Sequence, residues 1–268
     1  MFSRPARDEQ ETNMANIIAC YKWVVNEAEI LFNKDLSLDL SAAHYKISDY
    51  DRNAIQLAVE LAKVNGARPV GLTCGGPESK KSFKDALSRG LEEAFLVDLG
   101  EDRNVDGVLT ANALAYGVNK IGDPSFIICA DASSDVYGRQ TGARIAANLR
   151  LPYVGLVCKA ELNGDTLTCV RKLDGELETV QVQAPAVISI LPETIDPIVP
   201  GLRALTMAGR KPSQIISEDE LKFLNNDKTT LIDDKAYVMV RKNIILEGET
   251  MAEKTQALAA ALKKEGVL

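Results

Sequence analysis

The sequence predicts an α/β fold with a doubly wound, mostly parallel sheet, and three observations carry this prediction. Short apolar runs alternate with helix-periodic segments from residue 16 to residue 157, as expected for βαβ units. Aromatic residues make up only 5% of the chain, so the core must be aliphatic, which suits parallel strands buried on both faces. From Cys158 the pattern changes to alternating strands and tight turns, which predicts an antiparallel hairpin insert.

The parallel part follows a regular order. The apolar run at 16–25 predicts a first strand, and Ser48 is a candidate N-cap for a helix that ends at Asn65-Gly66. Further strands are expected at 69–74, 93–97, 125–130 and 153–157, and helices at 78–89, 105–121 and 138–149. We expect right-handed crossovers between these strands.

The second half departs from this rhythm. A hairpin turning at Asn163-Gly164, a strand at 179–183 and a buried strand at 185–190 precede a proline-rich loop with a helix at 201–209. The remainder, 213–268, predicts strands at 236–240 and 243–246 and a final helix with a capping box at Thr250 and Glu253. We therefore expect a disordered extension at 1–13, an α/β nucleotide-binding domain at 14–212, and an arm at 213–268. The arm has too few apolar residues for its own core and must pack on the main domain or on a partner, and we expect the partner.

Composition excludes several classes of protein. The chain has 31 basic and 38 acidic residues, a net charge of −7, which argues against a nucleic-acid binder. Its 5 cysteines are odd in number and lack metal-binding spacing, so we expect free thiols in a reducing cytoplasm. No apolar stretch is long enough to span a membrane, and residues 1–13 lack the apolar core of a secretory signal.

Candidate binding residues follow the predicted strands. Ligands of open α/β sheets bind beyond the carboxyl ends of the strands, where the segments after Cys20, after Cys74 and from Ala130 to Gly142 would meet. The third of these is rich in Ser, Asp, Gly and Thr and leads into a helix, whose free N–H groups attract phosphate. An ordinary capped loop explains the same spacing. No P-loop, GxGxxG or GxSxG motif occurs, and no nucleophile or general base stands out.

Longer motifs carry a resemblance to a known family. These are the first strand with Lys22, the segments 46–51 and 133–135, the run Gln140-Thr141-Gly142, and the segments 171–180 and 185–189. Over nearly all of residues 14–268 the chain resembles the beta subunit of electron-transfer flavoproteins. It looks most similar to the branch associated with carnitine metabolism and nitrogen-fixation electron supply. Cys169 departs from the pattern, because the family prefers a small aliphatic residue there.

The resemblance implies an adenine-nucleotide-binding, HUP-like fold and an electron carrier without catalytic residues of its own. The partner alpha subunit would hold most of a shared FAD, and this chain would hold AMP or a second FAD. The matching cofactor-binding positions are Cys20, Ser48, Asp49, Tyr50, Asp51, Cys74, Ala130, Asp131, Ala132, Ser133, Ser134, Asp135, Val136, Tyr137, Gly138, Arg139, Gln140 and Thr141. Tyr137 and Arg139 would either fill the space of a larger ligand or stack on an isoalloxazine, so both nucleotides remain open.

The resemblance also implies a docking loop for acyl-CoA dehydrogenase-type partners. The matching residues are Pro197, Ile198, Val199, Pro200 and Leu202, with Val199 as the apolar anchor. The chain departs from the family pattern at Ile195, Ile198 and Lys172. A loop packed on its own domain is the alternative.

Two other functions fit an α/β nucleotide binder. A stand-alone regulator of the universal-stress type is the main alternative, although such a domain has no need of the hairpin insert or the arm. A nucleotide-activating enzyme of the N-type pyrophosphatase kind would place an SGGxDS-like loop after the first strand, where this chain has residues 22–25, Lys-Trp-Val-Val.

Overall fold

A computed structural model describes residues 15–100, 105–221, 229–230, 232, 234–237 and 240–268. The chain divides into two units. The main unit extends up to Leu31 and from Asp39 to Asp234, and the smaller unit comprises Phe32–Leu38 and Lys235–Leu268. The expected extension at 1–13 lies outside the described residues.

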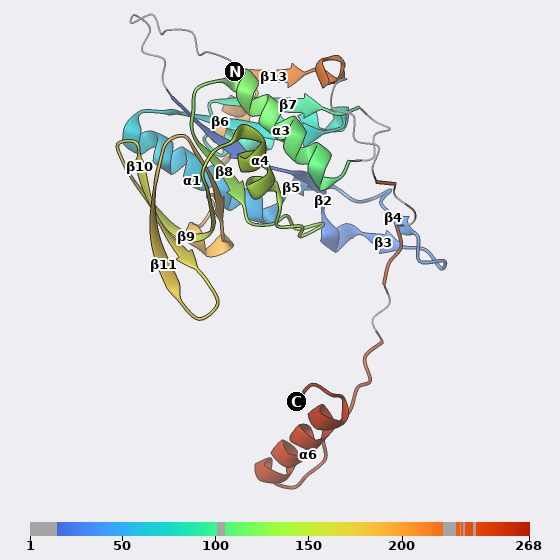
Figure 1. Cartoon of the computed structure of the whole chain (residues 1–268). Helices are drawn as coiled ribbons and strands as arrows, with labels where there is room; N and C mark the ends of the chain where they lie inside the picture. Colours follow the sequence, from blue (N-terminus) through green and yellow to red (C-terminus); the bar gives the residue numbers. More distant parts are fainter. Residues whose placement is uncertain (1–14, 101–104, 222–228, 231, 233, 238–239) are drawn as a thin grey trace, which may run out of the picture. The chain divides into compact units, whose positions relative to one another are not determined.

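A nine-stranded sheet forms the centre of the main unit, in the order β11-β10-β9-β12-β8-β1-β6-β7-β13 (Figure 1). The strands from β9 to β13 in this order run parallel to their neighbours, and β10 and β11 extend the sheet as antiparallel strands. The bounds are β1 Asn16–Cys20, β6 Arg68–Gly75, β7 Glu93–Asp98, β8 Pro124–Ala130, β9 Tyr153–Asn163, β10 Thr166–Lys172, β11 Leu177–Gln183, β12 Ala186–Ile190 and β13 Ser213–Ile216. This architecture confirms the predicted doubly wound, mostly parallel sheet with an antiparallel hairpin.

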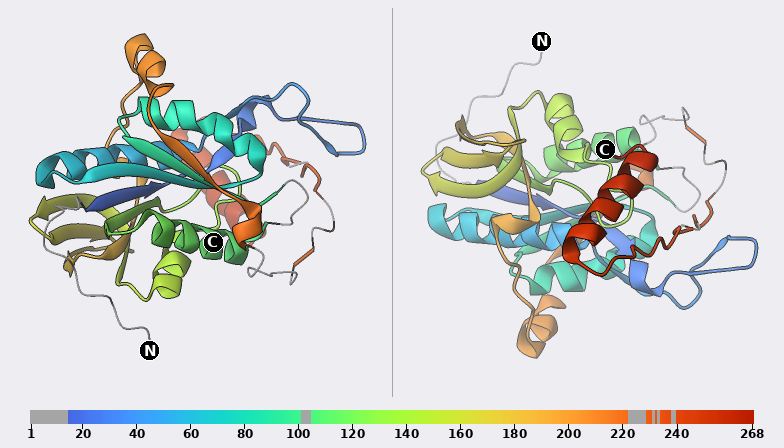
Figure 2. Two further views of the ribbon diagram at one scale, coloured as in Figure 1. Left: turned by 90° about the horizontal axis from the view of Figure 1, so that it is seen from above. Right: turned by 90° about the horizontal axis from the view of Figure 1, so that it is seen from below.

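Helices cover both faces of the sheet (Figure 2). Helices α1 (Asp49–Asn65) and α2 (Ser82–Ser88) lie on one face, and α3 (Gly107–Ile121) and α4 (Thr141–Leu149) on the other. Helix α1 ends where Gly66 adopts a left-handed conformation with φ of 68°, which glycine adopts without steric cost. Helix α3 begins at Asp106, whose side chain accepts hydrogen bonds from the backbone N–H groups of Val108 and Leu109.

The core is divided between these two faces by the alternation of side chains along each strand. In β1, Ile17 and Ala19 join the cluster under α1 and α2, whereas Ile18 and Cys20 join the cluster under α3 and α4. All five β1 residues are buried, as the continuous apolar run predicts.

The connections create a topological switch point at β1. The chain moves from β1 through α1 to β6 and through α2 to β7, then returns through α3 to β8 on the opposite side of β1. The carboxyl ends of β1 and β8 therefore flank the crevice in which open α/β sheets bind ligands.

Several predicted elements differ from the structure. The run at 16–25 divides into β1 and β2 (Trp23–Val25), and β2 pairs with β5 (Tyr45–Ile47) in a separate two-stranded sheet. The helix expected at 78–89 is a 3-10 turn, η2 (Pro77–Lys81), followed by α2. Helix α4 starts at Thr141 rather than 138, because Tyr137 and Arg139 adopt left-handed conformations with φ of 54° and 55°. Strand β9 continues through the expected break at 158.

The segment after 212 also differs from the expectation. Strand β13 pairs with β7 as an edge of the central sheet, so the main unit continues beyond the expected arm boundary and ends at Asp234. Residues 236–237, 240 and 243–246 form no strand, contrary to prediction, and 238–239 lie outside the described residues. Of the remaining elements, η1 (Glu27–Glu29), η3 (Pro192–Thr194), α5 (Leu202–Ala208) and η4 (Glu218–Leu221) belong to the main unit.

The smaller unit contains α6 (Met251–Lys264). The predicted capping box is present, since Thr250 accepts from the Glu253 N–H and the Glu253 carboxylate accepts from the Thr250 N–H. Strands β3 (Leu31–Phe32) and β4 (Leu38–Asp39) form a short sheet at the point where the chain passes between the units. In the described parts of the chain, no helix is both long and apolar enough to cross a membrane.

Candidate functional site

The predicted cofactor residues come from loops that meet at the switch point. Cys20 is the last residue of β1, Ala130 is the last residue of β8, and Cys74 lies near the end of β6. Ser48 to Asp51 form the start of α1, and Asp131 to Gln140 form the connection from β8 to α4. We refer to this group as the switch-point site.

Hydrogen bonds join these segments. The Ser134 N–H donates to Ser48 Oγ over 3.2 Å, which links the β8–α4 loop to the start of α1. The Lys22 N–H donates to Asp51 Oδ2 over 2.8 Å, and the Ser48 N–H donates to the Lys22 carbonyl over 3.0 Å. Ser48 is the N-cap residue of α1, as predicted, but its side chain makes no capping hydrogen bond and its hydroxyl instead accepts from the neighbouring loop.

Two carboxylates of different character lie in this network. Asp51 is buried, and burial raises its pKa to about 7 even though the Lys22 N–H favours the ionised form. Burial would also raise the pKa of Asp135, but the ion pair with Lys22 and the hydrogen bond from Ser133 outweigh it and lower the pKa. The site therefore holds one firmly ionised carboxylate and one that titrates near neutrality.

One buried polar atom in the network lacks a hydrogen-bond partner in the described part of the chain. Ser134 Oγ is buried and has no hydrogen-bond partner among the described residues. Leaving a buried hydroxyl unsatisfied costs roughly 1–3 kcal/mol. An oxygen-rich ligand would remove that cost, and the first turn of α4 adds N–H groups that have no partner within the helix. These donors fit the phosphate and ribose oxygens of a nucleotide.

Two tyrosines and an arginine border the site. Tyr50 at the start of α1 and Tyr137 in the β8–α4 loop meet edge to face, with ring centroids 5.8 Å apart. Arg139 donates to Asp131 Oδ2 over 2.6 Å, so its guanidinium is held by its own loop. Tyr137 therefore contacts Tyr50 and Arg139 contacts Asp131, and neither geometry selects between the two uses predicted for these residues.

The cysteines near the site are free thiols, as are the other two of the chain. A hydrogen bond between Cys20 and Cys129, together with burial, raises the pKa of Cys20, and burial raises that of Cys74 to about 12. Both side chains therefore stay neutral and contribute apolar surface to the site.

The close approach of α4 to the sheet depends on Gly142. A Cβ there would overlap Ser189 Oγ of β12 and lie 3.2 Å from a ring carbon of Tyr153. The glycine thus lets the start of α4, with its N–H groups, approach the end of β12 and the switch point.

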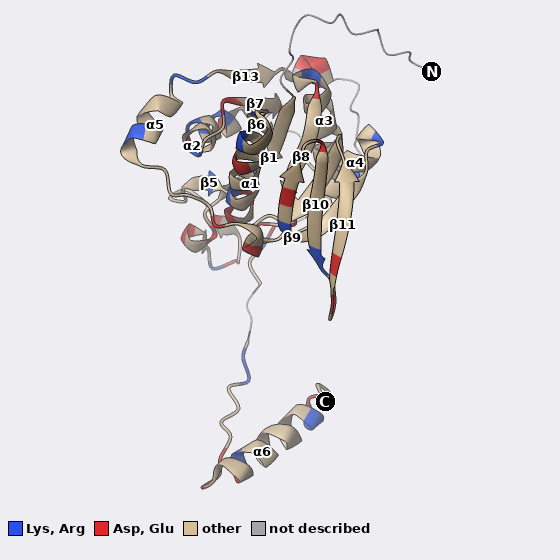
Figure 3. Ribbon diagram, turned by 90° about the vertical axis from the view of Figure 1, so that its left-hand side faces the viewer, with Lys and Arg blue, Asp and Glu red and all other residues tan. Residues whose placement is uncertain are grey.

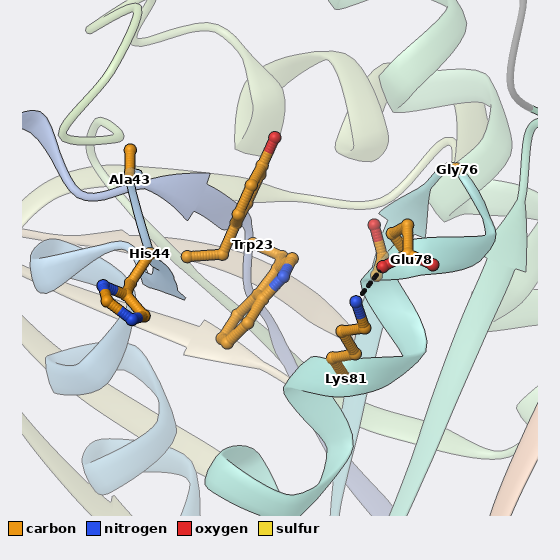
Figure 4. Close-up of a pocket in the computed structure, with 8 residues that line it drawn as sticks. Trp23, Ala43, His44, Gly76, Glu78 and Lys81 are labelled. Carbon is orange, nitrogen blue, oxygen red and sulfur yellow. Dashed lines mark ion pairs between the residues drawn. The ribbon is translucent and has the colours of Figure 1, made fainter. Parts of the chain in front are cut away.

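A pocket of about 540 Å³ beside the β2–β5 sheet was missed by the sequence analysis (Figure 4). Its aromatic wall is the stacked pair Trp23 and Tyr45, with ring centroids 6.3 Å apart, and its other side is formed by the segment after β6, including the ion-paired Glu78 and Lys81. This lining suits a planar or apolar group. The aromatic residues Trp23 and Tyr45 could have indicated a pocket wall. Their stacking, however, depends on the β2–β5 sheet, which the sequence did not predict.

The predicted docking residues lie in another part of the main unit. The side chains of Val199 and Leu202 are 92% and 82% exposed, and Ile198 is half-exposed. They follow β12 and are held against α1 and α2. The structure thus places the two predicted groups of residues apart, one around the switch point and one on this surface segment.

Comparison with known families agrees with this arrangement. Residues 35–221 match the model of the electron transfer flavoprotein domain, a span that includes every strand of the central sheet except β1. Proteins of this family are electron carriers associated with flavin, and the domain occurs in both alpha and beta subunits. Because the match covers well over half of the chain, this protein belongs to the electron transfer flavoprotein domain family.

Proposed function

We propose that the chain is the beta subunit of a heterodimeric electron-transfer flavoprotein of the cytoplasm. In this role it binds an adenine nucleotide at the switch-point site, helps the alpha subunit to form the site of a shared FAD, and docks acyl-CoA dehydrogenase-type partners. The redox chemistry belongs to the flavin, and the protein supplies binding and orientation.

The observation that carries the proposal is the unsatisfied Ser134 hydroxyl at the place where three loops are joined. Ser134 lies in the loop that leads into α4, and its N–H donates to the Ser48 hydroxyl. A nucleotide with its phosphate at the first turn of α4 would give Ser134 Oγ the partner that the described protein atoms do not provide. Asp51 and Lys22 hold the neighbouring backbone in place.

AMP and a second FAD remain the two candidate nucleotides, and we favour AMP. AMP is the smaller ligand and brings no isoalloxazine that would have to be placed beside the contacting rings of Tyr50 and Tyr137. A second FAD would require these rings to separate and receive the isoalloxazine between them.

The exposure of helix α6 in the smaller unit is evidence in favour of a partner subunit. None of the α6 residues is buried, and Met251 and Leu258 are 78% and 44% exposed. Isolated helices of this length are marginal in water without tertiary packing. We propose that the alpha subunit covers this unit.

Nucleotide analysis of the intact complex tests the proposal. The chain is co-expressed with an alpha-type subunit of the same organism, and the purified complex is denatured to release its nucleotides for chromatography. One FAD and one AMP per heterodimer is the expected result. Two FAD without AMP would instead support the flavin version of the site, which belongs to electron-bifurcating complexes. A chain that forms no complex and holds no nucleotide would overturn the proposal.

The universal-stress type of regulator is not favoured by the family match. Such a regulator would work alone, so a monomeric chain that binds nucleotide without any partner subunit would restore it.

A further inference from the structure

Polar side chains are buried beneath the surface segment that carries the proposed docking residues. Asn53 and Gln56 of α1 and Arg89 at the end of α2 are 7%, 5% and 9% exposed. They lie beside an aliphatic cluster formed by α1, α2 and the sheet, where unpaired polar groups would be costly. The hydrogen-bond partners of these three side chains therefore show which part of the chain they hold in place.

All three side chains bond to the backbone of one segment. Asn53 Nδ2 donates to the carbonyls of Pro192 and Ile195 over 2.8 and 2.6 Å. The Ile198 N–H donates to Gln56 Oε1 over 3.2 Å, and Arg89 donates to the Ile198 carbonyl over 3.2 Å. Both backbone groups of Ile198, the residue just before Val199, are thus fixed by buried side chains.

Arg89 and Gln56 are themselves held in place by other side chains. Arg89 Nε donates to Asp85 Oδ1 over 2.9 Å, and Gln56 Nε2 donates to Glu60 Oε1 over 2.9 Å. Beyond α5, Lys211 Nζ donates to the carbonyls of Leu87 and Leu91 over 2.9 and 2.6 Å. The segment 192–211, which we call the docking segment, is therefore fastened on both sides of its exposed part.

The exposed part presents apolar side chains with basic neighbours. Val199 and Leu202 project into solvent, and α5 lies against α2 at the edge of the main unit (Figure 3). Arg203 and Arg210 are exposed nearby, and no Asp or Glu occurs from residue 197 to residue 216. In a chain with a net charge of −7, this basic segment fits an apolar pocket with an acidic rim.

We infer that Asn53, Gln56 and Arg89 are positioning residues, which together we call the brace. The brace fixes the docking segment in its binding conformation before an acyl-CoA dehydrogenase-type partner binds. Val199 and Leu202 then enter an apolar pocket of that partner, which has an acidic rim. This inference rests on the docking role proposed above. A segment fixed beforehand loses less conformational freedom on binding, so the brace contributes to affinity without touching the partner.

The test measures electron transfer from a substrate-reduced acyl-CoA dehydrogenase of the same organism to the heterodimer, with the heterodimer as the varied substrate. Gln56→Met removes the acceptor for the Ile198 N–H while keeping the side-chain volume. We expect KM to rise about fivefold with kcat, flavin content and nucleotide content unchanged, and the Ile198 amide to exchange its hydrogen faster. Gln181→Met, which removes a side-chain bond to Thr168 on the hairpin, is the matched control and should leave KM unchanged.

A double-variant cycle separates the brace from a general loss of stability. Val199→Ser should raise KM without faster exchange at Ile198, and adding Gln56→Met to it should raise KM little further, because the brace acts through this anchor. If Val199→Ser raises KM and Gln56→Met does not, the brace is wrong and docking stands. If neither changes KM, the proposed docking role fails, and the brace with it. Arg89→Lys gives a second, milder test should Gln56→Met fail to fold.

Discussion

The switch-point site and the docking segment both depend on buried polar side chains, but the two regions use them in opposite ways. At the switch point, Asp51 and the hydroxyl oxygen of Ser134 are buried in a network that leaves this hydroxyl without a partner among the described residues. Beneath the docking segment, Asn53 and Gln56 are fully engaged, and the side chains left without partners are the apolar Val199 and Leu202 on the surface.

The difference indicates two kinds of recognition. An unsatisfied polar group inside the fold favours a small polar ligand that enters and completes the network. A satisfied polar layer under exposed apolar side chains favours a macromolecule that covers them from outside. If this comparison holds, variants in the first region should change nucleotide binding and pH response, and variants in the second should change partner binding.

The largest effect is expected from Asp51→Asn. The pKa of Asp51 is raised from 3.8 to about 7 in the folded protein, so between about pH 4 and pH 7 the folded state retains a proton that the unfolded chain releases. The free energy of unfolding therefore falls as pH rises through this window and changes no further above it. Asparagine keeps an oxygen for the Lys22 N–H but carries no buried charge. The variant should match the wild type near pH 4 and be more stable at pH 8 by on the order of 4 kcal/mol.

Urea unfolding at a series of pH values measures this difference. Asp49→Asn, two residues away and paired on the surface with Lys46 and Arg52, is the control and should change stability by less than about 1 kcal/mol. A stability gain for Asp51→Asn that does not grow from pH 4 to pH 7 would show that Asp51 does not titrate as described.

Ser134→Ala tests whether the unsatisfied hydroxyl is a ligand group. The substitution removes no hydrogen bond to described protein atoms, and the backbone bond to Ser48 remains possible. Because an unsatisfied buried hydroxyl is itself destabilising, the nucleotide-free heterodimer should keep or raise its Tm, whereas AMP affinity, measured by calorimetry, should fall about tenfold.

Ser133→Ala provides the contrast within the same loop. Ser133 Oγ donates to Asp135 over 2.6 Å, so its loss should reduce the free energy of unfolding by about 1 kcal/mol. If Ser134→Ala lowered Tm and left AMP affinity intact, Ser134 would be a structural residue. The switch-point region would then no longer differ from the docking segment in having a hydroxyl reserved for a ligand.

The sequence predicted which loops meet at the switch point better than it predicted the contacts beneath the docking segment, for physical reasons. Buried parallel strands appear as continuous apolar runs, and the rule that ligands bind at their carboxyl ends then brings Cys20, Cys74 and Ala130 together. The final helix was predicted from its capping residues, Thr250 and Glu253, because capping is local in sequence.

Long-range pairings could not be predicted in this way. Asn53 and Gln56 bond to residues at least 139 positions away, and in the helical pattern of α1 they look like ordinary polar positions. The same holds for β13, whose four residues become an edge of the sheet only because β7 is available to pair with them. The left-handed conformations of Tyr137 and Arg139 move the start of α4 to Thr141. The sequence did not predict these conformations, because neither residue is a glycine.

The smallest effect is expected from the charged rim of the docking segment. Arg203 is exposed beside Leu202, and a rim charge acts mainly by steering the encounter of two proteins, so its loss changes the association rate more than the dissociation rate. Arg203→Gln should lower the association rate with the dehydrogenase about two- to threefold at low ionic strength. At 0.5 M salt the difference should vanish, because a Debye length of roughly 4–5 Å screens it. Stopped-flow association measured across a salt series distinguishes the cases, with Lys120→Gln on α3, which packs on the opposite face of the sheet from α1 and α2, as a basic control away from the segment. A loss that persists at high salt would mean that Arg203 is buried in the complex, and the partner pocket would then need an acidic group in its interior rather than on its rim.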